Sequence, residues 1–171
     1  MPVTCGDMIV NVMNLPPFEA PVGVQIKRAF PGDRDKILRF IREHFHEGWA
    51  LEAETALLQV PGTCFIAEEA GEILGFACYD VSALNFFGPT GVRQDARGRG
   101  IGRSLLLACL WAMRLKGYAY AVIGWVSDAA EFYRKTVGAT FIPGGDPAHS
   151  VYQNMVGMEP KHESKSKPLV N

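Results

Sequence analysis

Apolar and polar positions along this chain form short segments that predict strands separated by helices. Strands are expected where apolar residues alternate or run continuously between turn residues. These segments are 24–30, 64–67, 73–79, 85–92, 118–126 and 140–142, with further short strands expected at 8–13 and 151–156. Helices are expected after Asp33 and over 47–60, 100–116 and 128–136, where apolar residues recur at helical spacing. This order predicts an α/β (α+β) fold with one sheet of mixed strand direction.

Two consecutive segments are expected to lie at the centre of the fold. The helix at 100–116 is apolar nearly all round, so it should be buried on more than one side. The strand at 118–126 is apolar on both faces, which is typical of a central, parallel strand. In the strand at 85–92, Pro89 has no N–H to donate. Together with Gly88 and Gly91, it predicts a splayed or bulged strand.

Size and composition indicate one soluble globular domain. The chain has 171 residues, of which 48% are hydrophobic and 20% charged. Its net charge of −1 argues against nucleic acid or a membrane surface as a partner. The N-terminus shows no basic segment followed by an apolar one, and no apolar run approaches a membrane span, so we expect a cytoplasmic protein. A homodimer is left open.

The chain divides into three parts by its composition. Residues 1–23 form an N-terminal extension of open role with one short strand, residues 24–156 form the main domain, and residues 157–171 form a polar tail expected to be disordered. The four cysteines have no metal-ligand spacing, and no metal is expected. Three of them lie inside apolar runs and are predicted to be buried core thiols; the four are Cys5, Cys64, Cys78 and Cys109.

A basic glycine-rich run, Arg97-Gly98-Arg99-Gly100-Ile101-Gly102-Arg103-Ser104, joins the strand at 85–92 to the helix at 100–116. Glycines let backbone N–H groups approach phosphate oxygens, and the start of a helix together with arginines favours an anion. The spacing excludes a Walker A loop and a dinucleotide fingerprint, because Arg103 stands where either motif, counted from Gly98, needs a glycine. A local basic patch in a near-neutral chain suits a small anion better than a polymer.

The segment Arg97-x-x-Gly100-x-Gly102 resembles the pyrophosphate loop of the GNAT superfamily of N-acyltransferases, Gln/Arg-x-x-Gly-x-Gly/Ala. Downstream, Ala129, the run Phe132-Tyr133-Arg134-Lys135 and Gly138 resemble a second motif of that family. The resemblance covers about residues 24–156. It implies a GNAT-like fold, with one twisted, partly splayed sheet of six to seven strands and about four helices. It also implies an acyltransferase that uses acetyl-CoA.

The resemblance further implies roles for individual residues. Tyr133 would protonate the departing thiolate of coenzyme A, because the family places a tyrosine hydroxyl near that sulfur. A backbone N–H near Val92 would stabilise the developing oxyanion, and the pantetheine arm would pair with residues 91–92 as an extra strand. The implied coenzyme-binding residues are Gly91, Val92, Arg97, Gly98, Arg99, Gly100, Ile101, Gly102, Arg103 and Ser104.

The acceptor and the general base are left open by the sequence. The stretch 85–91 holds no carboxylate, so the candidate bases lie in neighbouring segments: Glu47, Glu52, Glu54, His46 and Asp80. The candidate acceptor-pocket residues are Trp49, Glu52 and Phe87. We expect acetyl transfer from acetyl-CoA to a primary amine of a small molecule, by direct attack in a ternary complex. The alternative is a non-catalytic acyl-CoA-binding or regulatory module of the same fold.

Overall fold

The computed structural model of the chain describes residues 4–158, and its elements alternate much as the pattern predicts. The helices are α1 (Arg34–His44), α2 (Glu47–Leu58), α3 (Ile101–Lys116) and α4 (Ala130–Val137). The strands are β1 (Gly6–Asn11), β2 (Gln25–Arg28), β3 (Cys64–Glu69), β4 (Glu72–Tyr79), β5 (Phe86–Val92), β6 (Tyr120–Val126) and β7 (Thr140–Phe141). The expected fold class is confirmed: one seven-stranded mixed sheet with four α-helices.

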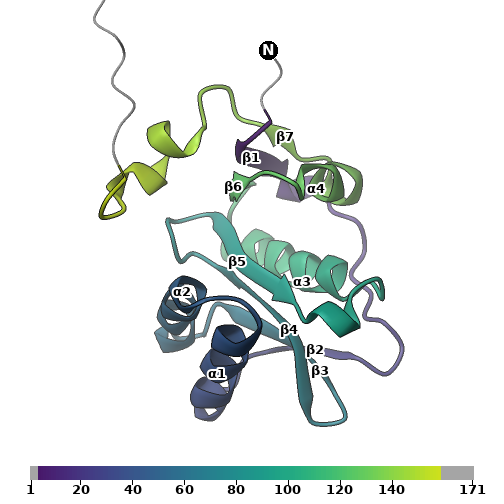
Figure 1. Cartoon of the computed structure of the whole chain (residues 1–171). Helices are drawn as coiled ribbons and strands as arrows, with labels where there is room; N and C mark the ends of the chain where they lie inside the picture. The colour runs from purple at the N-terminus through teal and green to yellow at the C-terminus, as the bar shows by residue number, and fades with distance from the viewer. Residues whose placement is uncertain (1–3, 159–171) are drawn as a thin grey trace, which may run out of the picture.

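The strands lie in the order β2-β3-β4-β5-β6-β1-β7 (Figure 1). All neighbours are antiparallel except β5 and β6, which are parallel and joined through α3. The predicted central position of β6 is confirmed. A parallel connection needs a crossover, and α3 supplies it from the end of β5.

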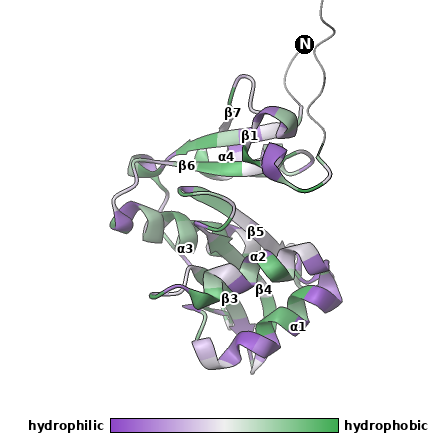
Figure 2. Ribbon diagram, turned by 90° about the vertical axis from the view of Figure 1, so that its left-hand side faces the viewer, coloured by the Kyte–Doolittle hydropathy of each residue, from purple (hydrophilic) through white to green (hydrophobic). Residues whose placement is uncertain are grey.

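Helices cover both faces of the sheet (Figures 1 and 2). In β4 successive side chains point to opposite faces, so Ala77 joins the core under α3 whereas Phe76 joins the core under α1 and α2. The prediction that α3 is buried on several sides is confirmed, since its fully buried residues include Leu105, Leu106 and Leu110. Burying one such side chain stabilises the fold by about 1.5–3 kcal/mol.

The N-terminal strand β1 is an internal strand of the sheet. The strand expected at 8–13 forms at Gly6–Asn11, between β6 and β7. Met8 and Val10 are fully buried, and the pairing with β6 has a bulge between Gly6 and Met8. Residues 6–11 thus complete the core beside α3 and reach the end of β6 that borders the site described below.

The sheet opens between β5 and β6. Their pairing is limited to Phe86 with Val122 and Phe87 with Ile123, so the rest of β5 has a free edge on that side. The pairing of β4 with β5 shifts register between Ala77 and Tyr79, next to Pro89. The predicted splayed or bulged strand is therefore confirmed.

The prediction of a strand at 151–156 is wrong. Val151–Asn154 is a 3-10 helix with Ser150 as its N-cap, and the backbone N–H of Gln153 donates to the Ser150 carbonyl. The ring of Tyr152 packs against Trp125 and Phe86, on the two sides of the opening in the sheet. Packing across that opening, rather than pairing with an edge strand, decides the local conformation.

The structure of residues 4–158 tests the expectations for the cysteines, for a metal site and for a membrane-spanning helix. Cys64, Cys78 and Cys109 are buried free thiols, as predicted, whereas Cys5 is half-buried. Within residues 4–158, no group of His, Cys, Asp or Glu is arranged to hold a metal ion. No helix in that range is long and apolar enough to cross a membrane. Of the polar tail expected at 157–171, residues 159–171 lie outside the described residues.

Candidate functional site

The glycine-rich run forms the turn between β5 and α3. Gly98 and Gly100 have φ values of +79° and +83°, a left-handed conformation that favours glycine. Gly100 is the N-cap of α3, and no side chain within the described residues caps this helix start. The first backbone N–H groups of α3 are therefore available to an anion, and the helix dipole adds a partial positive charge.

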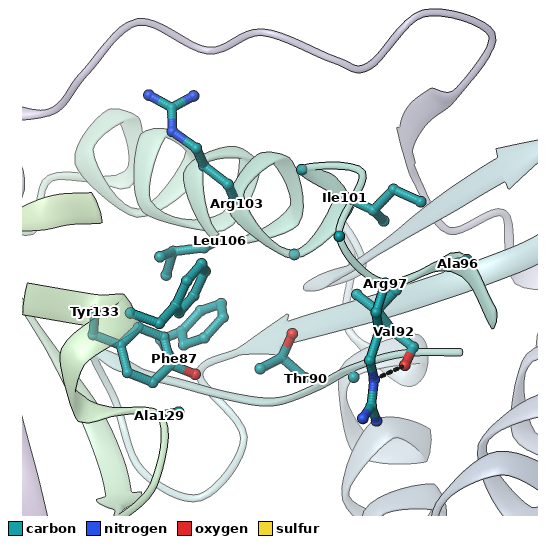
Figure 3. Close-up of a pocket in the computed structure, with 15 residues that line it drawn as sticks. Phe87, Thr90, Val92, Ala96, Arg97, Ile101, Arg103, Leu106, Ala129 and Tyr133 are labelled. Atoms are coloured by element: carbon teal, nitrogen blue, oxygen red, sulfur yellow. Dashed lines mark hydrogen bonds between the residues drawn. The ribbon is translucent and has the colours of Figure 1, made fainter. Parts of the chain in front are cut away.

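A cavity of about 530 Å³ lies against this turn (Figure 3). It is bounded by the free part of β5, the start of α3 and the start of α4. Figure 3 shows Phe87 and Tyr133 at one end, and Arg97 and Val92 at the other. The lining residues are Phe87, Thr90, Gly91, Val92, Ala96, Arg97, Gly98, Gly100, Ile101, Gly102, Arg103, Leu106, Ala129, Phe132 and Tyr133. Eight of the ten expected coenzyme-binding residues are thus brought together.

The remaining two, Arg99 and Ser104, point elsewhere. Arg99 donates two hydrogen bonds to Glu69, at 3.1 and 2.6 Å, which holds its guanidinium on β3. The hydroxyl of Ser104 is buried and donates to the carbonyl of Glu19 at 2.6 Å. Neither residue lines the cavity. These partners, Glu69 and Glu19, could not be predicted from the sequence, because both lie far away along the chain.

The free edge of β5 presents backbone groups to the cavity. The carbonyl of Val92 accepts a hydrogen bond from Nε of Arg97 at 3.1 Å, drawn as a dashed line in Figure 3. In a strand the N–H and C=O of one residue point to the same side. The N–H of Val92 therefore also points away from β4, toward the side where β6 has separated.

Tyr133 lies at the inner end of the cavity. Its side chain is 7% exposed, and its ring packs edge-on against Phe87 at 6.2 Å and Phe132 at 5.1 Å. Burial raises the pKa of Tyr133 to about 12. Its hydroxyl hydrogen-bonds to no group among residues 4–158. A neutral, unpaired phenol at this place can donate a proton at physiological pH.

A second, larger cavity of about 1190 Å³ lies beyond Tyr133. It shares five lining residues with the first: Phe87, Thr90, Arg97, Ala129 and Tyr133. All three expected acceptor-pocket residues, Trp49, Glu52 and Phe87, line it. The two cavities meet at the opening between β5 and β6, so ligands in them would approach each other beside Tyr133.

The five candidate bases are separated by the structure. Glu52 and His46 line the second cavity, whereas Glu47 pairs with Arg42 and Glu54 with Arg34. Asp80 is buried and binds Lys116, Tyr118 and the N–H of Asn85. Neither Glu47, Glu54 nor Asp80 lines either cavity.

Between the two that line it, Glu52 is the better placed base. Nδ1 of His46 accepts the backbone N–H of Trp49 at 3.3 Å and caps α2. A neutral histidine that accepts at Nδ1 carries its proton on Nε2, so it offers a donor there. The carboxylate of Glu52 accepts one hydrogen bond, from the hydroxyl of Ser82 at 3.1 Å, and retains further acceptor capacity.

Several residues of the second cavity were missed by the sequence analysis. They include Ser82, Trp125, Asp128 and Tyr152. Trp125 looks like a core residue in an apolar strand, yet it is 43% exposed and has a φ of +48°. Tyr152 lies in the segment for which a strand was expected. The one available signal in the sequence for this part of the cavity was an aromatic residue, Trp125, near the end of the strand predicted at 118–126.

Comparison with known proteins agrees with this geometry. A family model described as the acetyltransferase (GNAT) domain matches residues 61–136, a range that contains both the glycine turn and Tyr133. No curated protein matches the sequence. The resemblance to the GNAT superfamily is confirmed, and the chain has the GNAT fold.

Solved structures show the same fold at low sequence identity. A GCN5-related N-acetyltransferase from Sphaerobacter thermophilus is 23% identical with a TM-score of 0.65, over 82% of this chain and 49% of that one. A GNAT-family acetyltransferase from Colwellia psychrerythraea is 16% identical with a TM-score of 0.60, over 81% and 54%. A GCN5-related glucosamine N-acetyltransferase region of a fungal multi-domain β-N-acetylglucosaminidase is 16% identical with a TM-score of 0.61, over 78% and 19%. The chain thus spans about half or less of these proteins.

Proposed function

We propose that the chain is an acetyltransferase that moves the acetyl group of acetyl-CoA to a primary amine of a small molecule by direct attack in a ternary complex. The observation that carries this proposal is that Tyr133 lines both cavities. One cavity adjoins an uncapped helix start of the kind that binds phosphates, and the other has room for an acceptor. The two reactants would meet beside a protonated phenol.

The residues of the first cavity fit the coenzyme. Backbone N–H groups at the start of α3 would bind the pyrophosphate, and Arg103 and Arg97 would add charged donors. The free edge of β5 around residues 91–92 would pair with the amides of the pantetheine arm, as an added strand does. Acetyl-CoA supplies a thioester, whose carbonyl carbon the amine attacks.

Each proton in the transfer has a place among the chain's own residues. The amine must lose a proton to attack, and Glu52 would accept it, directly or through water. A free backbone N–H of β5 near Val92 would stabilise the negative charge that develops on the carbonyl oxygen. A C–N bond forms, the C–S bond breaks, and Tyr133 would give its proton to the leaving thiolate.

Thiol release from acetyl-CoA, measured across a panel of primary amines, tests the proposal. The expected result is amine-dependent thiol release with acetylated amine as the product, detected by mass spectrometry. Tight coenzyme binding without turnover of any amine would contradict it. That result would instead favour the non-catalytic acyl-CoA-binding module of the same fold.

A further inference from the structure

The second cavity combines aromatic rings with carboxylates. Its aromatic residues come from five separate segments of the chain: Trp49, Phe87, Trp125, Tyr133 and Tyr152. Its carboxylates are Glu52 and Asp128. Its basic residues are Arg97, at the end shared with the first cavity, and His46, whose Nδ1 accepts a hydrogen bond; no lysine is among the residues that line it. This composition favours a ligand with a positive charge and a large apolar group.

One wall of the cavity is an aromatic pair at the opening of the sheet. The rings of Trp125 and Tyr152 lie 5.2 Å apart between centroids. Trp125 is 43% exposed and holds a left-handed backbone conformation, which is uncommon for a bulky residue and is found at ligand sites. Its backbone N–H donates a hydrogen bond to the carboxylate of Asp7 at 2.9 Å. The indole is therefore held out of the core and against the cavity.

The carboxylate of Glu52 lines the same cavity. Trp49 and Glu52 are three residues apart on α2, so they share one face of the helix. The hydroxyl of Ser82 donates to Glu52 at 3.1 Å and also interacts with Tyr152. Glu52 is thereby joined to the aromatic wall through one hydroxyl, which fixes the separation between a charged group and a ring.

Given the acetyl transfer proposed above, we infer that this cavity takes a primary amine that bears an aromatic ring, with its nitrogen at Glu52 and its ring against Trp125 and Tyr152. An amino sugar would use the polar side chains of the lining but would leave the rings of Trp125 and Tyr152 without an apolar partner. A polyamine with more than two charges would lack a carboxylate for each of them, because the lining offers two. An aryl-alkyl amine matches both the rings and the one carboxylate, Glu52, that α2 contributes to the lining.

Calorimetric binding of simple amines to the protein saturated with coenzyme A tests this inference without any turnover. The probes are 2-phenylethylamine, n-butylamine, glucosamine and spermidine. Phenylethylamine should bind about tenfold more tightly than butylamine, because an aromatic pair adds to the area that is buried. Trp125→Ala should remove that tenfold preference, so that the two amines bind with similar affinity. Phe30→Ala is the matched control, since Phe30 is 70% exposed and lies outside the cavity.

Glu52→Gln should weaken phenylethylamine and butylamine equally, while Glu54→Gln, on the same helix but outside the lining, should not. Tyr152→Leu provides a second test of the aromatic wall where Trp125→Ala does not fold. Equal affinities for the two amines, or tighter binding of glucosamine or spermidine, would overturn the inference. If binding depended on the ring but no amine were acetylated, the proposed function would be contradicted. The inference that the cavity binds an aryl-alkyl amine would still hold.

Discussion

The carboxylate of Asp7 accepts a hydrogen bond from the backbone N–H of Trp125 at 2.9 Å, and so joins the N-terminal strand to the wall of the second cavity. The other oxygen of Asp7 accepts a hydrogen bond from the hydroxyl of Ser150, just before the 3-10 helix that carries Tyr152. A buried aspartate at the bulge of β1 thus positions both rings of the aromatic wall.

Asp7→Ala should destabilise the protein, because it leaves the N–H of Trp125 without an acceptor. We expect a loss of about 1–3 kcal/mol in the free energy of unfolding, measured by urea denaturation. Asp7→Asn keeps an acceptor oxygen and should lose less than the alanine variant. Equal losses in the two variants would show that charge, and not this hydrogen bond, is what Asp7 contributes.

Tyr133→Phe should slow acetyl transfer by about 10²-fold without weakening coenzyme binding, because it removes only the proton donor. The ring contact with Phe87 is retained, so the thermal stability should change little. Rates are measured by thiol release and affinity by calorimetry. Tyr120→Phe, at a residue that is 52% exposed, is the matched control. Unchanged turnover in Tyr133→Phe would remove the tyrosine from the reaction.

Stability should fall at alkaline pH over a range that depends on two tyrosines, Tyr133, which is buried, and Tyr152, which is half-buried. Burial raises the pKa of both Tyr133 and Tyr152 to about 12, whereas an unfolded tyrosine titrates near pH 10. The folded state therefore keeps protons that the unfolded state loses. Their contribution is intact below about pH 10 and is lost as the pH rises toward 12.

Urea denaturation at a series of pH values measures this effect. The double variant Tyr133→Phe, Tyr152→Phe should show a flatter decline between pH 10 and 12 than the wild-type protein. An identical decline in both proteins would mean that other groups carry the alkaline transition.

Most elements could be predicted from the sequence, because their signals are local. The turn at Pro31 and Gly32, the stop at Gly117 and the apolar run of α3 each depend on neighbouring residues. The place of β1 between β6 and β7 could not be predicted, since strand order depends on contacts between distant residues. The prediction of a strand at 151–156 failed for the same reason. Tyr152 packs across the opening between β5 and β6, which depends on how distant strands pair.

Some features of the candidate site could likewise be predicted from the sequence, and others could not. The glycine turn and Tyr133 are contained in short motifs that resemble those of the GNAT superfamily, and that resemblance implied one coenzyme site for both. The partners of Arg99 and Ser104 lie at Glu69 and Glu19, and nothing near those arginine and serine positions indicates them. In the sequence, Trp125 looks like a core residue of an apolar strand. In the structure it is exposed, has a left-handed backbone conformation and lies beside the bulge of β1.

The glycines of the turn should differ in their response to alanine. Gly100→Ala should cost about 1–2 kcal/mol of stability, because a side chain is strained at its φ of +83°. Gly102 lies within α3, and a Cβ there would meet Val92 at an ordinary 3.6 Å. Gly102→Ala should therefore be neutral or stabilise by up to about 1 kcal/mol, and coenzyme binding should persist. Thermal denaturation and calorimetry with coenzyme A measure the two effects. Equal destabilisation in the two variants would contradict a left-handed requirement at Gly100.

Arg103 and Arg99 both belong to the basic turn, yet they should contribute differently to coenzyme affinity. Arg103 lines the first cavity, and it has no ion pair or hydrogen bond from its side chain among residues 4–158. Arg99 is held by two hydrogen bonds to Glu69 outside that cavity. Arg103→Gln should therefore weaken coenzyme A binding by about tenfold, the loss of one charge-assisted contact, whereas Arg99→Gln should change it little.

Salt separates a direct phosphate contact from an indirect one. Calorimetry at increasing ionic strength should show a shallower loss of affinity in Arg103→Gln than in the wild-type protein, because one screened charge pair has been removed. Glu69→Gln releases the guanidinium of Arg99 and should either leave coenzyme affinity unchanged or raise it. If Arg99→Gln proved as costly as Arg103→Gln, Arg99 would have to leave Glu69 when the coenzyme binds, and the ion pair would compete with the ligand.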